Sequence, residues 1–255
     1  MSKPWRCERI LVTGAASGIG RAFAVHLVAQ GIEVLAVDTN AAGLDALAAE
    51  NSRVIPAVID VTDHEALAKV VADHPCDGVV TSAAIGTEGM ITETDPELWL
   101  EVATINYLGT VWAVAAAMPE MRRRGRGTIV VLSSSSGGLL PTFHEGPYSP
   151  TKAAISAYAR ALRQEVKSMG IQVACVYPPA VDTPLLDQMQ ASRQLAKGIF
   201  KPMPAEGVVR ATERALRRGR FAVVPGFSRP LRWLMRISPE LGDKLPGIVY
   251  RREFG

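Results

Sequence analysis

The stretch that most restricts the possible folds of this chain is a glycine-rich turn between an apolar strand and an apolar helix. The strand-like run Ile10–Thr13 leads into Thr-Gly-Ala-Ala-Ser-Gly-Ile-Gly, and a helical pattern follows over 18–30. Glycines let a tight turn approach a pyrophosphate, and the helix N-terminus adds positive dipole charge. The spacing is G-x-x-x-G-x-G, not the commoner G-x-G-x-x-G. The turn therefore predicts a dinucleotide site that includes Gly14, Ser17, Gly18, Ile19 and Gly20.

Short β-branched runs alternate with longer helical patterns along the rest of the chain. Strands are expected at Ile10–Thr13, Glu33–Val37, Arg53–Ile59, Gly78–Thr81, Thr128–Leu132, Gln172–Val176 and Phe221–Val224. Helices are expected near 18–30, 41–50, 63–73, 96–121, 147–169 and 205–218. The strands are apolar without alternation, as in parallel sheets covered on both faces. The pattern predicts an α/β fold, a single domain over 1–255 with a doubly wound (Rossmann) parallel sheet of about seven strands and helices on both faces.

Two acidic residues follow predicted strands where such folds bind the adenosine. Asp38 ends the second strand, and no Lys or Arg stands at Thr39 or in the glycine turn. A carboxylate there accepts hydrogen bonds from ribose hydroxyls and repels a 2′-phosphate, which predicts NAD as the cofactor. The alternative is a helix N-cap or an exposed carboxylate. Asp60 and Val61 close the third strand beside the expected adenine, although Asp60 could equally be a turn residue.

A tyrosine and a lysine stand four residues apart at the start of the predicted fifth crossover helix. Tyr148 and Lys152 would project from one helical face. A free phenol has a pKa of about 10. A neighbouring ammonium, together with the positive nicotinamide ring, favours the phenolate, so Tyr148 could exchange a proton with an alcohol or ketone oxygen. Chance alone gives about 0.14 such pairs in a chain with five tyrosines and seven lysines, so the pair needs its context.

With these motifs in this order, the chain resembles the short-chain dehydrogenase/reductase family over 10–224. The family patterns T-G-x-x-x-G-x-G and Y-x-x-x-K are matched as quoted, and an asparagine on the fourth crossover helix is matched by Asn106. The resemblance implies that Tyr148 is the acid/base, that Lys152 assists it, and that Asn106 holds a water in a proton relay to solvent.

Two further family patterns are matched with changes. P-G-x-V-x-T reads Pro-Pro-Ala-Val-Asp-Thr over 178–183, and N-N-A-G reads Thr-Ser-Ala-Ala over 81–84. The second change replaces asparagine amides by hydroxyls and affects local cofactor contacts. By the resemblance, the remaining cofactor contacts are Ala83, Ala84, Pro178, Val181 and Thr183, with Tyr148 and Lys152.

The family's catalytic serine falls within four consecutive serines, 133–136. The family's usual spacing to the tyrosine selects Ser135, whereas counting the strand forward from Gly127 selects Ser134. Adjacent strand positions face opposite ways, so only one can face the substrate. Ser135 is preferred, with a role in binding the substrate oxygen.

The substrate pocket is expected from the segments 85–90, 137–146 and 180–200, and the region around 180–203 is expected to be a mobile substrate loop. These segments are rich in apolar residues, which suit a lipophilic substrate, although core packing would explain them equally. His144 could also lie in a solvated loop. The candidate substrate contacts are Leu140, Phe143, His144, Leu185 and Met189.

The function expected from these residues is an NAD-dependent oxidoreductase that interconverts a hydrophobic secondary alcohol and its ketone. The segments Tyr-Ser-Pro-Thr-Lys and Tyr-Pro-Pro-Ala-Val-Asp-Thr-Pro are also similar to 3-ketosphinganine reductases. That resemblance implies an NADPH-dependent keto-lipid reductase, in conflict with Asp38. A dinucleotide-binding module without chemistry is a third alternative.

Charge and cysteine content restrict location and partners. The net charge is +3, but from Arg210 onward eleven Lys and Arg face four Asp and Glu, a net of +7, so the first 209 residues carry 3 − 7 = −4. The basic and apolar tail 226–255 could meet an anionic membrane surface or a second subunit. A homodimer or homotetramer is expected, with no nucleic-acid partner. Three scattered cysteines suggest neither a disulfide frame nor a metal site. No signal peptide or membrane-spanning stretch is recognised, so a cytoplasmic location is expected.

Overall fold

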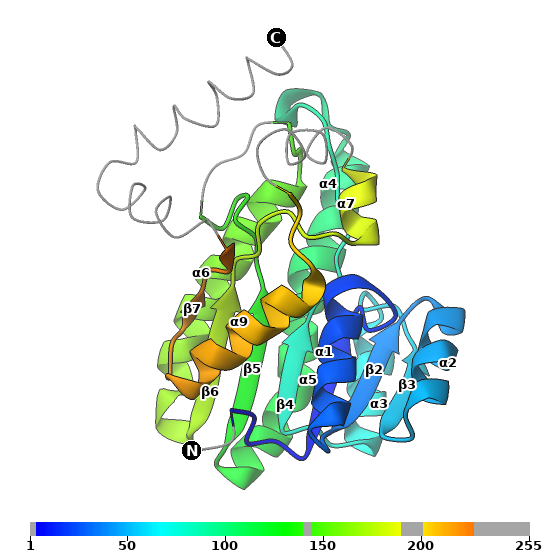
Figure 1. Ribbon diagram of the computed structural model, residues 1–255. Helices are drawn as coiled ribbons and strands as arrows, with labels where there is room; N and C mark the ends of the chain where they lie inside the picture. Colours follow the sequence, from blue (N-terminus) through cyan, green and yellow to red (C-terminus); the bar gives the residue numbers. More distant parts are fainter. Residues whose placement is uncertain (1–3, 140–143, 190–200, 227–255) are drawn as a thin grey trace.

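The computed structural model describes residues 4–139, 144–189 and 201–226, and its centre is one seven-stranded sheet (Figure 1). All strands are parallel, in the order β3-β2-β1-β4-β5-β6-β7. This confirms the predicted doubly wound α/β fold. The strands are β1 (Arg9–Thr13), β2 (Glu33–Asp38), β3 (Val54–Val58), β4 (Gly78–Thr81), β5 (Gly127–Leu132), β6 (Ile171–Val176) and β7 (Ala222–Val223).

Helices cover both faces of the sheet because successive strand residues point to opposite sides. Ile10 and Val12 of β1 lie in one core with α1 (Gly18–Ala29), α2 (Ala41–Glu50) and α9 (Ala205–Arg217), whereas Leu11 lies in the other. The second core holds α3 (His64–Asp73), α5 (Gly109–Arg124) and α6 (Tyr148–Glu165). In Figure 1, α1 and α9 lie in front of the sheet. Two buried faces explain the unbroken apolar runs of the strands.

The fourth crossover helix is interrupted where the sequence predicts one continuous helix. It consists of α4 (Pro96–Val102), the π-helical stretch η2 (Ala103–Leu108) and α5. A π turn inserts one extra residue into a helical turn and is often found at functional sites. Here it carries Asn106, which is fully buried.

This long helical run corrects our expectation about membrane-spanning stretches. Pro96–Arg124 contains an 18-residue window with a mean hydropathy of 1.3, so by length and composition it could cross a membrane. Its residues Val114, Ala117 and Met121 are instead buried in the core between helices and sheet. A core helix of an α/β protein passes the same test, so the hydropathy alone identifies no span.

Short elements complete the fold, and of these only η3 lies within an expected helix, 147–169, whose α-helical part ends at Glu165. They are the 3₁₀ turns η1 (Ile91–Glu93) and η3 (Lys167–Met169) and the short helix α7 (Pro184–Gln188). Part of the expected substrate loop is therefore helical, while its residues 190–200 lie outside the described residues. Leu140, Phe143 and almost all of the tail 226–255 also lie outside them, so their predicted roles stay predictions.

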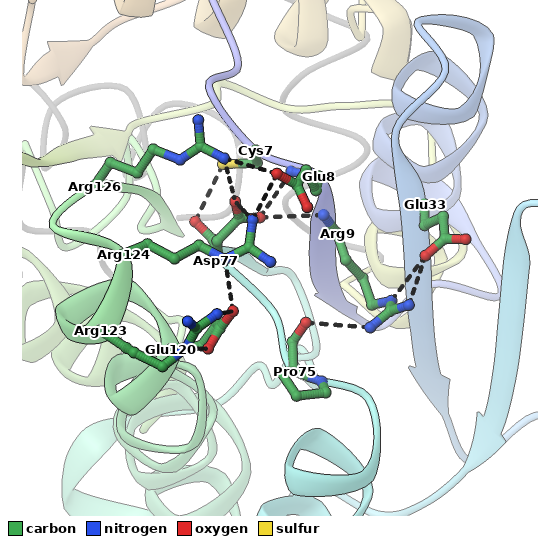
Figure 2. Close-up of polar contacts among 10 residues, drawn as sticks. All are labelled: Cys7, Glu8, Arg9, Glu33, Pro75, Asp77, Glu120, Arg123, Arg124 and Arg126. Atoms are coloured by element: carbon green, nitrogen blue, oxygen red, sulfur yellow. Dashed lines mark hydrogen bonds and ion pairs between the residues drawn. The ribbon is translucent and has the colours of Figure 1, made fainter.

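The amino ends of the central strands are joined by a charged network around Asp77, which Figure 2 shows. Asp77 is 1% exposed and accepts hydrogen bonds from the backbone N–H groups of Glu8 at 2.8 Å and Arg9 at 3.1 Å. Arg124 and Arg126 lie 3.2 Å and 3.7 Å from the same carboxylate. A nearly buried carboxylate needs such partners to offset its desolvation. The network ties the chain before β1 to β4 and to the end of α5.

Candidate active site

The glycine turn brings the end of β1 against the end of β4. Gly14 has a left-handed backbone (φ +66°), and a Cβ there would lie 2.7 Å from the backbone nitrogen of Ala83. Gly18, also left-handed (φ +51°), begins α1, and Gly20 packs its backbone against the Gly14 carbonyl. The turn therefore tolerates no side chain at these positions and leaves the α1 N-terminus open to an anion.

A cavity of about 270 Å³, named here the carboxyl-end cavity, lies where the strand order reverses between β1 and β4. Ligands of open α/β sheets bind at this switch point. Of the residues predicted from sequence, the cavity is lined by Gly14, Ser17, Gly18, Ile19, Asp38, Asp60, Val61, Ala83, Ala84, Thr183 and Leu185. A dinucleotide fits this donor set, because the walls combine free helix N–H groups with two carboxylates at the opposite end.

Asp38 is a bracing residue as well as a wall of the cavity. Its Oδ2 accepts a hydrogen bond from Ala16 N at 3.0 Å, and its Oδ1 accepts one from Asn40 N at 2.9 Å. The N-cap of α2 is Asn40, which accepts from Gly43 N at 3.0 Å, so the alternative that Asp38 is an N-cap is wrong. Each carboxylate oxygen keeps further acceptor capacity for a ligand hydroxyl.

Asp60 combines the two interpretations that the sequence left open. Its Oδ1 accepts a hydrogen bond from Thr62 N at 2.8 Å, which is the pattern of an Asx turn, and the residue also lines the carboxyl-end cavity. Val61 is buried beneath it, and a Cβ added at Gly109 would lie 2.8 Å from a Val61 methyl group. The start of α5 thus holds Val61 at the cavity wall.

Tyr148 and Lys152 occupy the first turns of α6, and both are buried, at 6% and 4% exposure. The Lys152 ammonium lies 5.4 Å from the centre of the Tyr148 ring and donates a hydrogen bond to the Leu132 carbonyl at 3.2 Å. They do not line the carboxyl-end cavity. They stand beside it, at the end of β5, which is the strand next to β4.

The protein's own groups favour a protonated Tyr148 and an easily deprotonated Lys152. Burial, followed by the charge of Glu145, raises the pKa of Tyr148 well above its ordinary value, while a hydrogen bond with Ser134 lowers it in part. Burial lowers the pKa of Lys152 to about 8. Among the protein's own groups, desolvation therefore has the largest effect on the phenol.

The four serines after β5 have different partners. Ser134 is the one whose hydroxyl hydrogen-bonds the Tyr148 side chain, and it also accepts from Ser136 N at 3.1 Å. Ser135 instead uses its backbone N–H, which donates to the Pro178 carbonyl at 2.8 Å. Ser133 donates to the Lys152 carbonyl at 2.8 Å. The geometry thus favours Ser134, contrary to the preference for Ser135 taken from family spacing.

Asn106 joins the π turn to two neighbouring elements. Its Oδ1 accepts from Ile85 N at 2.9 Å, and its Nδ2 donates to the Ile85 carbonyl at 3.0 Å and to Thr151 Oγ1 at 3.4 Å. Ile85 lines the carboxyl-end cavity, and Thr151 precedes Lys152 on α6. Asn106 therefore joins the loop after β4 to α6.

The loop after β6 forms the wall opposite the glycine turn. Val181 is 6% exposed and pairs with Met203, and Thr183 donates from its hydroxyl to the Val181 carbonyl at 3.2 Å. Thr183 is the N-cap residue of α7, and a Cβ on Gly18 would lie 3.0 Å from its methyl group. The predicted contacts Pro178, Val181 and Thr183 thus lie along one loop that reaches the turn.

The three described candidates for substrate contact lie at three different places. Leu185 lines the carboxyl-end cavity, whereas Met189 is 4% exposed and packs beside Gly86. His144 has a left-handed backbone (φ 61°), and its carbonyl accepts from Gly89 N at 3.1 Å. That pairing holds the segment before Tyr148 against the loop after β4.

Three side chains that contribute to the site are not among the candidates named above, although Glu145 and Gln188 lie in the segments expected to form the pocket. Thr13 Oγ1 accepts from the backbone nitrogens of Ser82 at 3.2 Å and Ala83 at 3.3 Å, which joins the end of β1 to the loop after β4. Glu145, 4% exposed, raises the pKa of Tyr148, and Gln188 lines the carboxyl-end cavity. The threonine before Gly14 was a usable signal, but the other two have no local motif. Within the described part of the chain, no cluster of three or more His, Cys, Asp or Glu is placed to hold a metal ion.

Solved structures share this architecture. A short-chain dehydrogenase from Streptomyces avermitilis is 29% identical and superposes with a TM-score of 0.80 over 90% of this chain and 93% of its own. A short chain dehydrogenase/reductase from Burkholderia phymatum, in complex with NAD, gives a TM-score of 0.82 over 95% and 97%, at 22% identity. At that identity the second likeness supports the fold alone.

Relatives with known names extend the comparison to sequence. A 2-keto-3-deoxy-L-fuconate dehydrogenase of Xanthomonas campestris pv. campestris is 33% identical over 182 residues, 71% of this chain but 61% of that protein. A galactitol 2-dehydrogenase (L-tagatose-forming) of Cereibacter sphaeroides is 35% identical over 192 residues, 72% and 75% of the two chains. An uncharacterised NAD-dependent oxidoreductase of Mycobacterium tuberculosis is 31% identical over 222 residues, 76% and 81%.

The family model described as short chain dehydrogenase matches residues 8–194, which is most of the chain and includes the glycine turn, Asn106, Ser134, Tyr148 and Lys152. With the parallel sheet, the switch-point cavity and the buried tyrosine–lysine pair, this match establishes that the chain belongs to the short-chain dehydrogenase/reductase family of oxidoreductases.

Proposed function

We propose that the protein is an NAD(H)-dependent oxidoreductase that interconverts a secondary alcohol and its ketone. The observation that carries the proposal is the buried group Ser134, Tyr148 and Lys152 beside the carboxyl-end cavity. When bound, the dinucleotide would supply or accept the hydride. The glycine turn and Asp38 would hold it at its two ends.

In this proposal the chain itself moves only the proton. During reduction, the Tyr148 hydroxyl donates its proton to the substrate oxygen, and during oxidation the phenolate takes it back. Burial favours the protonated phenol, which is the form that donates a proton. The protein's own groups therefore favour the reduction direction. Ser134 donates a hydrogen bond to the same substrate oxygen. After reduction Lys152 stabilises the phenolate and delivers a proton to it from the solvent side, and in oxidation it carries the proton taken up by Tyr148 outward past Asn106.

The decisive variant is Tyr148→Phe, which removes the hydroxyl and keeps the ring. Turnover should fall by about 10²–10⁴-fold or more, because a positioned acid/base is lost, while NADH binding stays nearly unchanged. Tyr158→Phe, on the same helix, is the matched control and should retain turnover. Unchanged turnover in Tyr148→Phe would refute the mechanism.

The preference for NAD over NADP is proposed from Asp38. A 2′-phosphate placed at the Asp38 carboxylate would meet like charge in the same wall of the cavity. Wild-type protein should bind NADH more tightly than NADPH, and Asp38→Asn should narrow that difference by weakening NADH. Asp45→Asn on the outside of α2 should leave both affinities unchanged. Tighter binding of NADPH by the wild type would favour the keto-lipid reductase alternative instead.

For the substrate we propose a hydrophobic secondary alcohol, such as a hydroxysteroid, a long-chain alcohol or a keto-lipid. The apolar residues Leu185 and Met189 near the site support it. The names of two relatives, galactitol 2-dehydrogenase and 2-keto-3-deoxy-L-fuconate dehydrogenase, favour polyhydroxylated substrates as the second candidate. An NAD⁺ reduction screen over both classes separates them, since turnover confined to polyols would contradict the hydrophobic assignment.

We further propose a cytoplasmic homodimer or homotetramer, with the tail 226–255 at a membrane surface or a subunit contact. Three free cysteines, one half-buried and two buried, suit a reducing compartment. Light scattering on the purified chain tests the oligomer, and removal of 227–255 followed by vesicle binding tests the tail.

A further inference from the structure

Gln188, the last residue of α7, lines the carboxyl-end cavity where the segment after β6 meets the loop after β4. Its Oε1 accepts a hydrogen bond from Gly86 N, in the loop after β4, at 3.1 Å. The same side chain lines the cavity together with Thr183 and Leu185. One carboxamide therefore contacts the loop and faces the ligand space.

The contact with Gly86 fixes the orientation of the carboxamide. A backbone N–H requires an acceptor, so the oxygen must be the end that faces Gly86. The Nε2 group, with two N–H donors, is then the other arm of the same plane and is directed away from Gly86. Since the side chain lines the cavity, these donors are available to a ligand in it.

Close packing keeps Gln188 at this position. The next residue, Met189, is 4% exposed, and a Cβ on Gly86 would lie 2.8 Å from Met189 Cγ and 3.3 Å from the Leu185 carbonyl. No space remains for α7 to approach the loop further. The side chain of Gln188 is exposed, while Met189, the next residue, is buried beside Gly86.

The start of α7 touches the place where an anion would bind. A Cβ on Gly18 would lie 3.0 Å from the Thr183 methyl group, so the N-cap of α7 adjoins the N-terminus of α1. Gln188 follows Thr183 by five residues, roughly 7–8 Å along a helix. Among the acceptors of a dinucleotide, the charged phosphate oxygens make the strongest hydrogen bonds with neutral donors.

We propose that Gln188 is a cofactor-binding residue whose Nε2 donates a hydrogen bond to the diphosphate of the dinucleotide. The proposal rests on the proposed function, because it takes the ligand of the carboxyl-end cavity to be NAD(H). The chain thereby adds a donor from the loop after β6 to the backbone donors of the glycine turn.

Two substitutions of Gln188 separate a ligand contact from a brace for Gly86. Gln188→Ala removes both functions and should weaken binding of NADH and of ADP-ribose about tenfold, the loss of one hydrogen bond to a charged acceptor. Gln188→Glu keeps an acceptor for Gly86 but replaces the donors by a carboxylate that repels the diphosphate. It should bind both ligands more weakly than Gln188→Ala. Calorimetry on the full chain measures both affinities.

Controls make the outcomes distinct. Gln164→Glu, exposed on α6, adds the same charge elsewhere and should leave both affinities unchanged. Thermal unfolding without ligand checks that each variant folds. Wild-type affinity in Gln188→Glu or in Gln188→Ala overturns the proposal, and so does a loss confined to NADH with ADP-ribose unaffected. Failure of the wild type to bind NADH would instead refute the proposed function itself.

Discussion

At the scale of single residues, hydrogen-bond partners distinguish consecutive residues of the same type. The four serines after β5 carry the same hydroxyl, yet one contacts Tyr148, one contacts the Lys152 carbonyl, and one uses its backbone toward Pro178. Spacing could not make this choice, because a shift of one position reverses the direction of a strand side chain. The placement of Tyr148 and Lys152 on one face of α6 was predictable, because it depends on helical spacing alone.

The serine assignment gives a paired prediction. Ser134→Ala should lower kcat/KM by about 10²-fold, because the substrate oxygen loses a positioned donor. Ser135→Ala should keep activity within a few-fold, since the contact seen for Ser135 is made by its backbone N–H. Steady-state kinetics on both variants decide between them. The reverse order of effects would restore Ser135 as the catalytic serine.

Lys152 provides a prediction about stability and pH. Its pKa is about 8 in the folded protein and about 10.4 when unfolded, so between these values the unfolded chain binds more protons, and stability rises with pH. Below pH 8 the full cost of the buried charge is present, roughly 3 kcal/mol at most. Lys152→Met should therefore raise the free energy of unfolding at pH 7, and the gain should shrink toward pH 10.

Urea unfolding at several pH values measures this difference, and turnover of the same variant should be lost. Loss of the hydrogen bond to the Leu132 carbonyl makes the gain smaller than the upper bound. Lys167→Met, at an exposed position in η3, should show no such dependence on pH. A Lys152→Met gain that is the same at pH 7 and pH 10 would contradict the burial argument.

At the scale of elements, the strands and helices follow from the sequence, but the break in the fourth crossover helix does not. Strand β4 and helix α2 have the predicted bounds, because turn residues and apolar runs mark their ends locally. The π turn depends on the Asn106 contacts with Ile85 and Thr151, which lie 21 and 45 residues away in sequence. Helical periodicity carries no information about such distant partners.

Asn106→Leu tests whether this buried amide stabilises the element. It should lower the free energy of unfolding by about 1–3 kcal/mol, because the N–H and C=O of Ile85 lose their partner. Turnover should fall as the loop after β4 loses its position. Thr104→Val, within the same π turn, removes only a contact with the Leu100 carbonyl and should change stability by less than about 0.5 kcal/mol. Denaturant unfolding of both variants gives the comparison, and equal effects would mean that the π turn does not depend on Asn106.

At the scale of the whole molecule, the candidate active site and the charged network around Asp77 lie at opposite ends of the sheet. The carboxyl ends of the strands hold the cavity and Tyr148, and the amino ends hold the network of Figure 2. The parallel sheet and its covering layers were predictable from the alternation of strands and helices. The charged network was not, because the residues before β1 and after α5 carry no motif that announces their contact with Asp77.

Asp77→Asn tests the support at the amino ends. It removes the buried charge that Arg124 and Arg126 face, and the free energy of unfolding should fall by about 3 kcal/mol. Arg123→Ala, whose side chain is 69% exposed, should leave the free energy of unfolding almost unchanged. NADH affinity of folded Asp77→Asn should equal that of the wild type. An affinity change as large as the stability change would show that the two ends are coupled.

The five residues of β1 place Arg9 beside the charged network and Thr13 beside the glycine turn, which puts the two roughly 13 Å apart. Substitutions so far apart usually contribute independently. Directed evolution of this protein can therefore first select substitutions around Asp77 that raise the free energy of unfolding. That added stability then tolerates destabilising substitutions around the cavity that change specificity. The two ends of the sheet can thus be substituted independently of each other.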